Sequence, residues 1–134
     1  MQDNLIKCSV LIVDDDNDLC NILSGVIRKI CPVHVEHSLK NADQYLEELN
    51  MAVVVLPDIV LLDNNLPDGA GVKYIKHIHD QYPEIKVVLM TADSTEGLKE
   101  KAFLEGATYF ISKPFRITSI SDILLSICPG LRAA

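Results

Sequence analysis

The chain of 134 residues is long enough for one domain with a proper core, and its 49% of apolar residues agree with that size of core. Its formal net charge of -7 argues against direct binding of nucleic acid, because such binding depends on clustered Lys and Arg side chains that face phosphates. We therefore expect one acidic globular domain over residues 1–134, without an output domain.

The cysteine spacing and the N-terminal sequence indicate in which cellular compartment the protein is found. Cys8, Cys20, Cys31 and Cys128 have no C-x-x-C spacing, which fits small apolar side chains in a reducing cytosol better than a disulfide framework or a zinc site. We expect four core or near-core thiols. The N-terminus lacks a basic start and a long apolar segment, and no apolar run approaches the roughly 18 residues of a membrane span. The sequence thus predicts a cytoplasmic protein.

In chain order, short apolar runs alternate with segments of helical spacing. The runs "VLIV", "IVLL" and "VVLM" are apolar at successive positions, as in strands that are covered on both faces. Asp16 or Asn17 is placed to cap the first helix, and Pro32 helps to end it. This alternation predicts a parallel sheet with helices on both faces. The expected strands lie at 10–13, 33–36, 59–62, 87–90 and 109–112, and the expected helices at about 17–30, 40–50, 71–82, 96–105 and 118–128.

Polar side chains follow four of the expected strands. Asp14 and Asp15 follow the first strand, Asp63 the third, Thr91 the fourth and Lys113 the fifth. Ligands of open parallel sheets bind at the carboxyl ends of the strands, and in a sheet of order 2-1-3-4-5 the first and third strands are neighbours. The three carboxylates would then converge, in an arrangement that suits a hard divalent cation such as Mg²⁺.

Four motifs carry a resemblance to a known family. The segments "LIVDDD" (11–16), "DIVLLDNNLPDGAG" (58–71), "VVLMTAD" (87–93) and "GATYFISKPF" (106–115) resemble the receiver domain of bacterial two-component response regulators. The resemblance covers about residues 6–128, nearly the whole chain. It implies a flavodoxin-like α/β fold, (βα)5, with a five-stranded parallel sheet of order 2-1-3-4-5 and helices on both faces.

The resemblance also implies roles for the polar residues at the strand ends. Asp63 becomes the phosphoryl acceptor, and the implied cofactor is Mg²⁺ or Mn²⁺. Its ligands would be Asp15, Asp63 and the backbone carbonyl of Asn65, with Asp14 in the outer sphere. Lys113 would contact a phosphoryl oxygen and Asp63, so that the metal and the ammonium group neutralise the charge of the transferred group.

Further positions are implied to switch or to tune the domain. Thr91 would hydrogen-bond the phosphoryl group, and Phe110 would occupy the aromatic switch position. Asn65 and Asp93 would tune the lifetime of the acyl phosphate. The peptide bond before Pro114 would be cis, as X-Pro bonds permit at modest cost.

The implied function is a signalling switch without turnover of a separate substrate. A histidine kinase or a histidine phosphotransfer protein would donate the phosphoryl group. The surface of the fourth helix, the fifth strand and the fifth helix, roughly residues 96–128, would carry the output and could form a homodimer. Neither nucleic acid nor a membrane is an expected direct partner of the domain.

Three other functions are alternatives to this one. A phosphorylation-independent pseudo-receiver, which acts as a protein interaction module, is the alternative left open. A haloacid-dehalogenase-type phosphatase needs a second Asp two residues after the nucleophile, where this chain has Asn65. A flavodoxin-type electron carrier needs hydroxyls and backbone N–H groups around a phosphate in its first loop, where this chain has "DDD".

Overall fold

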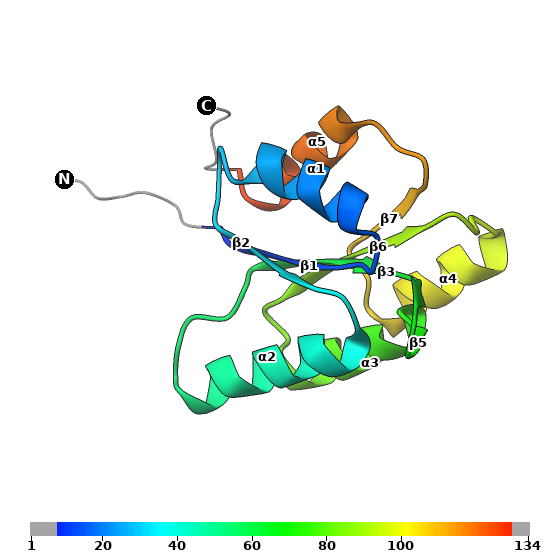
Figure 1. The fold of residues 1–134 in the computed structure, drawn as a ribbon. Helices are drawn as coiled ribbons and strands as arrows, with labels where there is room; N and C mark the ends of the chain where they lie inside the picture. Colours follow the sequence, from blue (N-terminus) through cyan, green and yellow to red (C-terminus); the bar gives the residue numbers. More distant parts are fainter. Residues whose placement is uncertain (1–7, 130–134) are drawn as a thin grey trace.

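The computed structural model describes residues 8–129 and contains a five-stranded parallel sheet of order β2-β1-β3-β6-β7 (Figure 1). Its strands are β1 (Val10–Val13), β2 (Val33–Glu36), β3 (Ile59–Asp63), β6 (Lys86–Thr91) and β7 (Tyr109–Ser112). The helices are α1 (Asn17–Ile27), α2 (Leu39–Met51), α3 (Val72–Gln81), α4 (Glu96–Glu105) and α5 (Ile117–Ile127). The predicted fold class and strand order are confirmed.

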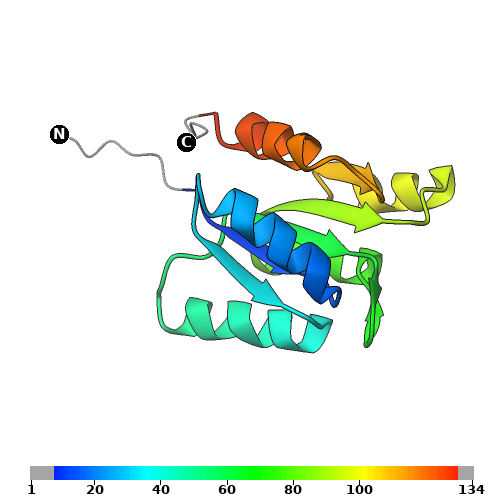
Figure 2. The ribbon, with the colours of Figure 1, turned by 45° about the horizontal axis from the view of Figure 1, so that its top comes forward.

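The sheet separates two layers of helices. Helices α1 and α5 cover one face, and α2, α3 and α4 cover the other (Figures 1 and 2). Successive residues of β1 alternate between the layers: Leu11 and Val13 pack with α2 and α3, whereas Val10 and Ile12 pack with α1 and α5. Because both faces are covered, every position of the strand is buried, which explains the unbroken apolar run.

The first helix is shorter than the predicted range of 17–30. Asp16 caps it, with its side chain accepting a hydrogen bond from the Leu19 amide at 3.1 Å. After Ile27 the chain tightens, because Lys29 and Ile30 donate to carbonyls three residues back instead of four. The apolar pattern therefore extends beyond the regular helix and includes one further tight turn.

The prediction of four separate thiols is wrong for two cysteines. Cys8 and Cys128 form a disulfide, with an S–S distance of 2.09 Å and a Cα–Cα distance of 6.4 Å. The two residues are 120 positions apart, but Cys8 precedes the central strand β1 and Cys128 follows α5, which packs on the same face of the sheet as α1. No short-range spacing could reveal this pairing. Cys20 and Cys31 are free and buried, as predicted.

Helix α2 ends in a conformation that does not suit its sequence. Val53 has a φ of 55°, and it is the only non-glycine residue with a positive φ between residues 8 and 129. The Val53 amide donates to the Asn50 carbonyl and the Val54 amide donates to the Leu49 carbonyl, which together form a Schellman motif. Glycine is the usual residue at this position because a side chain there is strained.

Replacing Val53 by glycine is expected to raise the free energy of unfolding by about 1 kcal/mol. Relief of the left-handed strain outweighs the extra backbone entropy of glycine in the unfolded chain, and the side chain is 92% exposed, so little packing is lost. Urea denaturation checks this value. Val55→Gly is the matched control: Val55 is also exposed but has no positive φ, so its replacement should give no gain.

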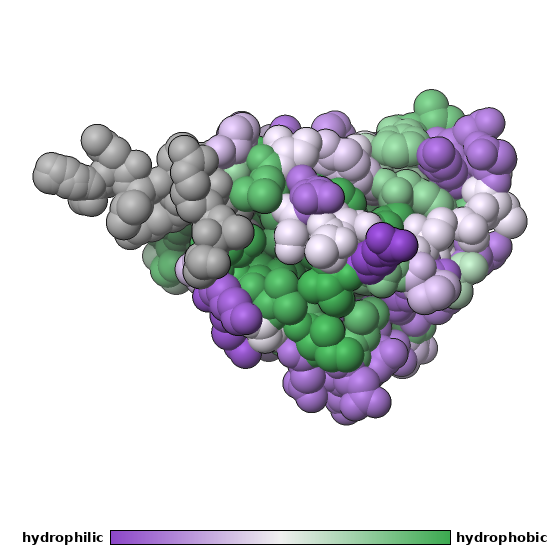
Figure 3. Space-filling model, turned by 90° about the horizontal axis from the view of Figure 1, so that it is seen from above, coloured by the Kyte–Doolittle hydropathy of each residue, from purple (hydrophilic) through white to green (hydrophobic). Residues whose placement is uncertain are grey.

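The face formed by α1 and α5 carries exposed apolar surface. In the view from above, hydrophobic side chains gather over α1 (Figure 3), and Ile22 of this helix is 54% exposed. Between residues 8 and 129, no helix has both the length and the apolar character required to cross a membrane.

Candidate functional site

The acidic residues meet at the carboxyl edge of the sheet. Asp14 directly follows β1, and Asp63 is the last residue of the neighbouring strand β3. Asp14 and Asp63 are buried, whereas Asp15 is exposed. One carboxylate oxygen from each of the three residues lies within 4.8 Å of the others. The structure thus brings together the three carboxylates that the strand ends predicted.

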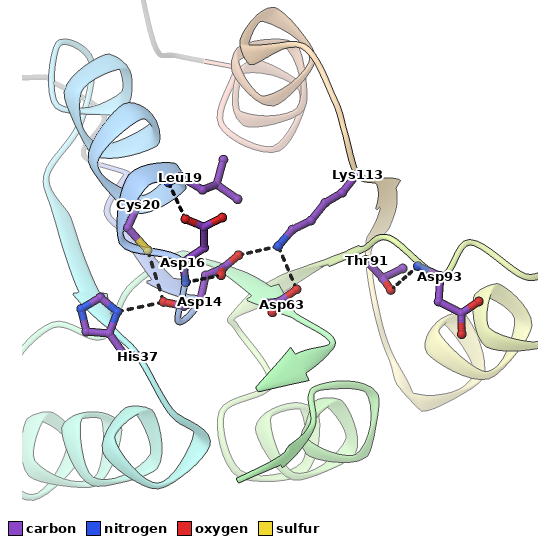
Figure 4. A network of polar contacts seen from close by, with 9 residues as sticks. All are labelled: Asp14, Asp16, Leu19, Cys20, His37, Asp63, Thr91, Asp93 and Lys113. Carbon is purple, nitrogen blue, oxygen red and sulfur yellow. Dashed lines mark hydrogen bonds and ion pairs between the residues drawn. The ribbon is translucent and has the colours of Figure 1, made fainter. Parts of the chain in front are cut away.

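Lys113 lies between the two buried carboxylates (Figure 4). Its Nζ donates to Asp14 Oδ2 at 2.8 Å and is paired with Asp63 Oδ1 at 3.0 Å. The contact with Asp63 was predicted, and the contact with Asp14 is an addition. The Lys113–Pro114 peptide bond is cis, as the resemblance implied.

This donor set fits a hard divalent cation. Three carboxylates supply oxygen ligands only, and the exposed Asp15 leaves one side of the cluster accessible. A pocket of about 330 Å³ opens beside it, lined by Lys113, Asp16, Leu19 and the turn that follows β7. The geometry therefore combines an acidic cluster that suits a divalent metal ion, a half-buried ammonium group and space for a further ligand.

Comparison with known proteins places the chain in a family. The family model of the response regulator receiver domain matches residues 10–125. The chain belongs to this family. As a receiver domain it is part of two-component signalling, and its strand order and acidic pocket agree with that assignment.

Three similar proteins illustrate the extent of the match. The receiver domain is 32% identical over 114 residues to the DNA-binding transcriptional regulator NtrC of Proteus hauseri, covering 83% of this chain and 22% of that protein. It is 31% identical over 126 residues to the phosphate regulon regulatory protein PhoB of Escherichia coli, covering 90% and 53%. The chain therefore spans only part of these relatives.

A solved response regulator of Burkholderia pseudomallei, described with a phosphorylated aspartic acid, a calcium ion and citrate, shares the fold. It superposes with a TM-score of 0.74 at 22% identity, and the match covers 88% of this chain and 66% of that one.

The buried groups of the receiver domain perturb one another. Burial raises the pKa of Asp63, the charge of Asp14 adds to the rise, and the hydrogen bond from Lys113 opposes it. For Lys113, burial acts to lower the pKa, but the hydrogen bonds to Asp14 and Asp63 outweigh it and the pKa is raised. Lys113 is therefore charged at neutral pH. The ionised form of Asp63 is less favourable in the folded protein than in the unfolded chain.

Asp63→Asn is expected to be more stable than the wild type at pH 7 without metal. A carboxyl group whose pKa is raised by folding stabilises the protein fully below its unfolded pKa of about 3.9, and that contribution is lost as the pH rises through the folded pKa. The advantage of the variant should shrink as the pH falls through this window. Urea denaturation at several pH values measures it. Asp122→Asn, at an exposed position on α5, is the control and should show no such gain.

Of the remaining predicted residues, Asn65 contacts the acidic cluster through its backbone, whose hydrogen bond to Asp63 opposes the rise of the Asp63 pKa. Thr91 is fully buried, and its Oγ1 accepts a hydrogen bond from the Asp93 amide at 2.9 Å, away from Asp63 (Figure 4). The side chains of Asn65 and Asp93 are exposed. Phe110 is half-buried and packs against the core on the side of α3 and α4.

Two side chains that the sequence reasoning missed support the first loop. Cys20 Sγ and His37 Nδ1 both donate to the backbone carbonyl of Asp14, at 3.3 and 2.9 Å (Figure 4). Burial raises the pKa of Cys20 to about 11, so its thiol keeps the proton that it donates. No sequence pattern indicated that either residue reaches the loop.

The turn after Asp63 is held by its neighbour Asn64. The Asn64 carbonyl accepts from the Gly71 amide at 2.8 Å, and its Oδ1 accepts from the Val72 amide at 3.0 Å. A Cβ at position 71 would overlap the Asp63 carbonyl oxygen, so only glycine allows α3 to begin this close to the strand. Gly71 thus sets how closely α3 packs against the end of β3.

Proposed function

We propose that this receiver domain accepts a phosphoryl group on Asp63 from a phosphohistidine, and that a bound Mg²⁺ or Mn²⁺ ion assists the transfer. The observation that carries the proposal is the position of Lys113, whose ammonium group lies 3.0 Å from Asp63 and 2.8 Å from Asp14 at the open edge of the sheet. A half-buried cation beside a buried carboxylate is an arrangement that suits transfer to this carboxylate.

In the transfer, an oxygen of the Asp63 carboxylate forms a bond to phosphorus. The P–N bond of the donor breaks, and its electron pair returns to the imidazole nitrogen. Lys113 neutralises charge on the equatorial oxygens. Asp15, Asp63 and the carbonyl of Asn65 would hold the metal, with Asp14 in the outer sphere, and the bound ion supplies further charge neutralisation.

The phosphorylated state is then read out through Thr91. To donate to the new phosphoryl group, its hydroxyl leaves the Asp93 amide, and the half-buried Phe110 moves into the vacated space. The polar side chains of Asn65 and Asp93 flank the site and tune the lifetime of the acyl phosphate. The resulting switch has no separate substrate to turn over.

The output surface of this proposal consists of α4, β7 and α5. Helix α4 is loosely held, because Ala102 is its only buried residue and Phe103 and Leu104 are 44% and 87% exposed. This surface can repack after phosphorylation and can form a homodimer. The phosphoryl donor is a histidine kinase or a phosphotransfer protein of the cytoplasm, and the domain itself binds neither nucleic acid nor a membrane.

Beryllofluoride, which imitates an aspartyl phosphate, tests the proposal. We expect chemical-shift changes in NMR spectra that saturate only when Mg²⁺ is present and that extend from Asp63 to Thr91 and Phe110. Asp63→Asn should abolish them. Asp122→Asn should respond as the wild type does.

The absence of any response in the wild type would contradict phosphorylation. It would favour the alternative, a phosphorylation-independent interaction module. A response that persists in Asp63→Asn would show that the anion binds elsewhere.

A further inference from the structure

A short hairpin after Asp63 reaches across to another helix. Strands β4 (Asn65–Leu66) and β5 (Gly69–Ala70) pair antiparallel, with Asn65 opposite Ala70 and Leu66 opposite Gly69. Only two residues connect them, so Asp68 lies at the tip of the hairpin. No sequence pattern indicates a strand pair here or a role for Asp68.

The carboxylate of Asp68 binds the N-terminus of α2. Its Oδ1 accepts from the Leu39 amide at 2.9 Å, and its Oδ2 accepts from the Lys40 amide at 2.8 Å. These bonds lower the pKa of Asp68, so its carboxylate is charged at neutral pH. The first amides of a helix lack partners within the helix and attract negative charge. Asp68 therefore caps the N-terminus of α2, although it follows Leu39 by 29 positions and Lys40 by 28 positions in the chain.

The same helix end also has a cap of its own. The side chain of Ser38 accepts from the Asn41 amide at 3.1 Å, one position beyond the two amides that Asp68 binds. Gly69, next to Asp68, lies so close to α2 that an added Cβ would be 3.2 Å from Leu39 Cδ1. The hairpin tip is thus bonded to α2 through Asp68 and leaves little space for a side chain at Gly69.

The attachment of Asp68 to α2 restrains the position of Asn65, because both residues lie on the same hairpin. The segment is held at its base by Asn64, which binds the amides of Gly71 and Val72, and on its inner side by the buried Leu66. Asp68 adds the attachment at the tip. With all three attachments in place, the backbone at Asn65 has little freedom to reorient.

We propose that Asp68 is a positioning residue for the metal site, which clamps the hairpin to α2 and so fixes the backbone carbonyl of Asn65. The inference rests on the proposed function, because that carbonyl becomes a ligand only if the acidic cluster binds a divalent cation. Asp68 itself contacts neither the metal nor the phosphoryl group.

Titration of the unphosphorylated protein with Mg²⁺, followed by NMR, tests the proposal. We expect Asp68→Ala to weaken Mg²⁺ binding about tenfold, the lower end of the loss that follows removal of a group supporting a metal ligand. Asp68→Asn, which keeps one good acceptor, should lose less. In metal-free protein, hydrogen exchange at the amides of Gly71 and Val72 should accelerate in Asp68→Ala.

Ser38→Ala is the matched control, because it removes a cap from the same helix end but leaves the hairpin attached. It should shift the urea midpoint to a lower concentration and leave Mg²⁺ affinity unchanged. Equal affinity of Asp68→Ala and the wild type, or an equal loss in Ser38→Ala, would overturn the positioning role alone. A wild type that does not bind Mg²⁺ would overturn the proposed function and this inference together.

Discussion

Replacing Lys113 by methionine is expected to destabilise the folded protein by about 3 kcal/mol at neutral pH. The ammonium group is paired with Asp14 and Asp63, whose side chains are 0% and 5% exposed, so its removal leaves two buried carboxylates without a cation. We take the lower end of the usual range because Lys113 is itself 21% exposed. Urea denaturation at pH 7 measures the loss.

The pH dependence distinguishes this cause from lost packing. Lys113 lowers the pKa of Asp63 against the effect of burial, so the pKa in the variant rises further. A group with a raised folded pKa regains its stabilising contribution as the pH falls through that value, and the deficit of Lys113→Met should therefore shrink in acid. Lys113→Arg, which keeps the charge, is the control. A deficit that does not vary with pH would point to packing.

Reduction of the Cys8–Cys128 disulfide should lower the free energy of unfolding by about 4 to 5 kcal/mol. The bond closes a loop between residues 120 positions apart, and the chain-entropy estimate for so long a loop has this size. The effect acts on the unfolded chain, which gains freedom when the bond is cut. Urea denaturation with and without a reductant gives the difference.

The double variant Cys8→Ser/Cys128→Ser provides the comparison. It should match the reduced wild type and should not respond to the reductant. The free cysteines Cys20 and Cys31 remain in both proteins, so any effect of the reductant on them would appear in the variant as well. If the reductant does not change the stability of the wild type, the two sulfurs are not bonded in solution.

The fold could be predicted because its signals are local. The runs at 10–13 and 59–62 are apolar at successive positions, which is typical of a strand covered on both faces. Once the strand order is known, the positions of Asp14, Asp63 and Lys113 at one edge of the sheet follow from the parallel topology.

The contacts that support the site could not be predicted in the same way. Asp68 reaches the amides of α2, and His37 reaches the Asp14 carbonyl, through loops whose paths depend on the packed fold. The Cys8–Cys128 disulfide joins residues 120 positions apart, and no repeating sequence pattern indicates such a pairing. The β4–β5 hairpin is two residues long on each side, too short for an alternating pattern to identify.

Because the sheet divides the core, the effects on stability of distant substitutions on its two sides are expected to add. The side chains between the sheet and α1 and α5 form one buried cluster, and those on the side of α2, α3 and α4 form another. Substitutions at distant sites that share no partner combine with deviations of only about 0.3–0.5 kcal/mol. Distant substitutions on the helices of opposite layers can therefore be optimised separately and then joined, whereas changes around Lys113, which bridges Asp14 and Asp63, must be designed together.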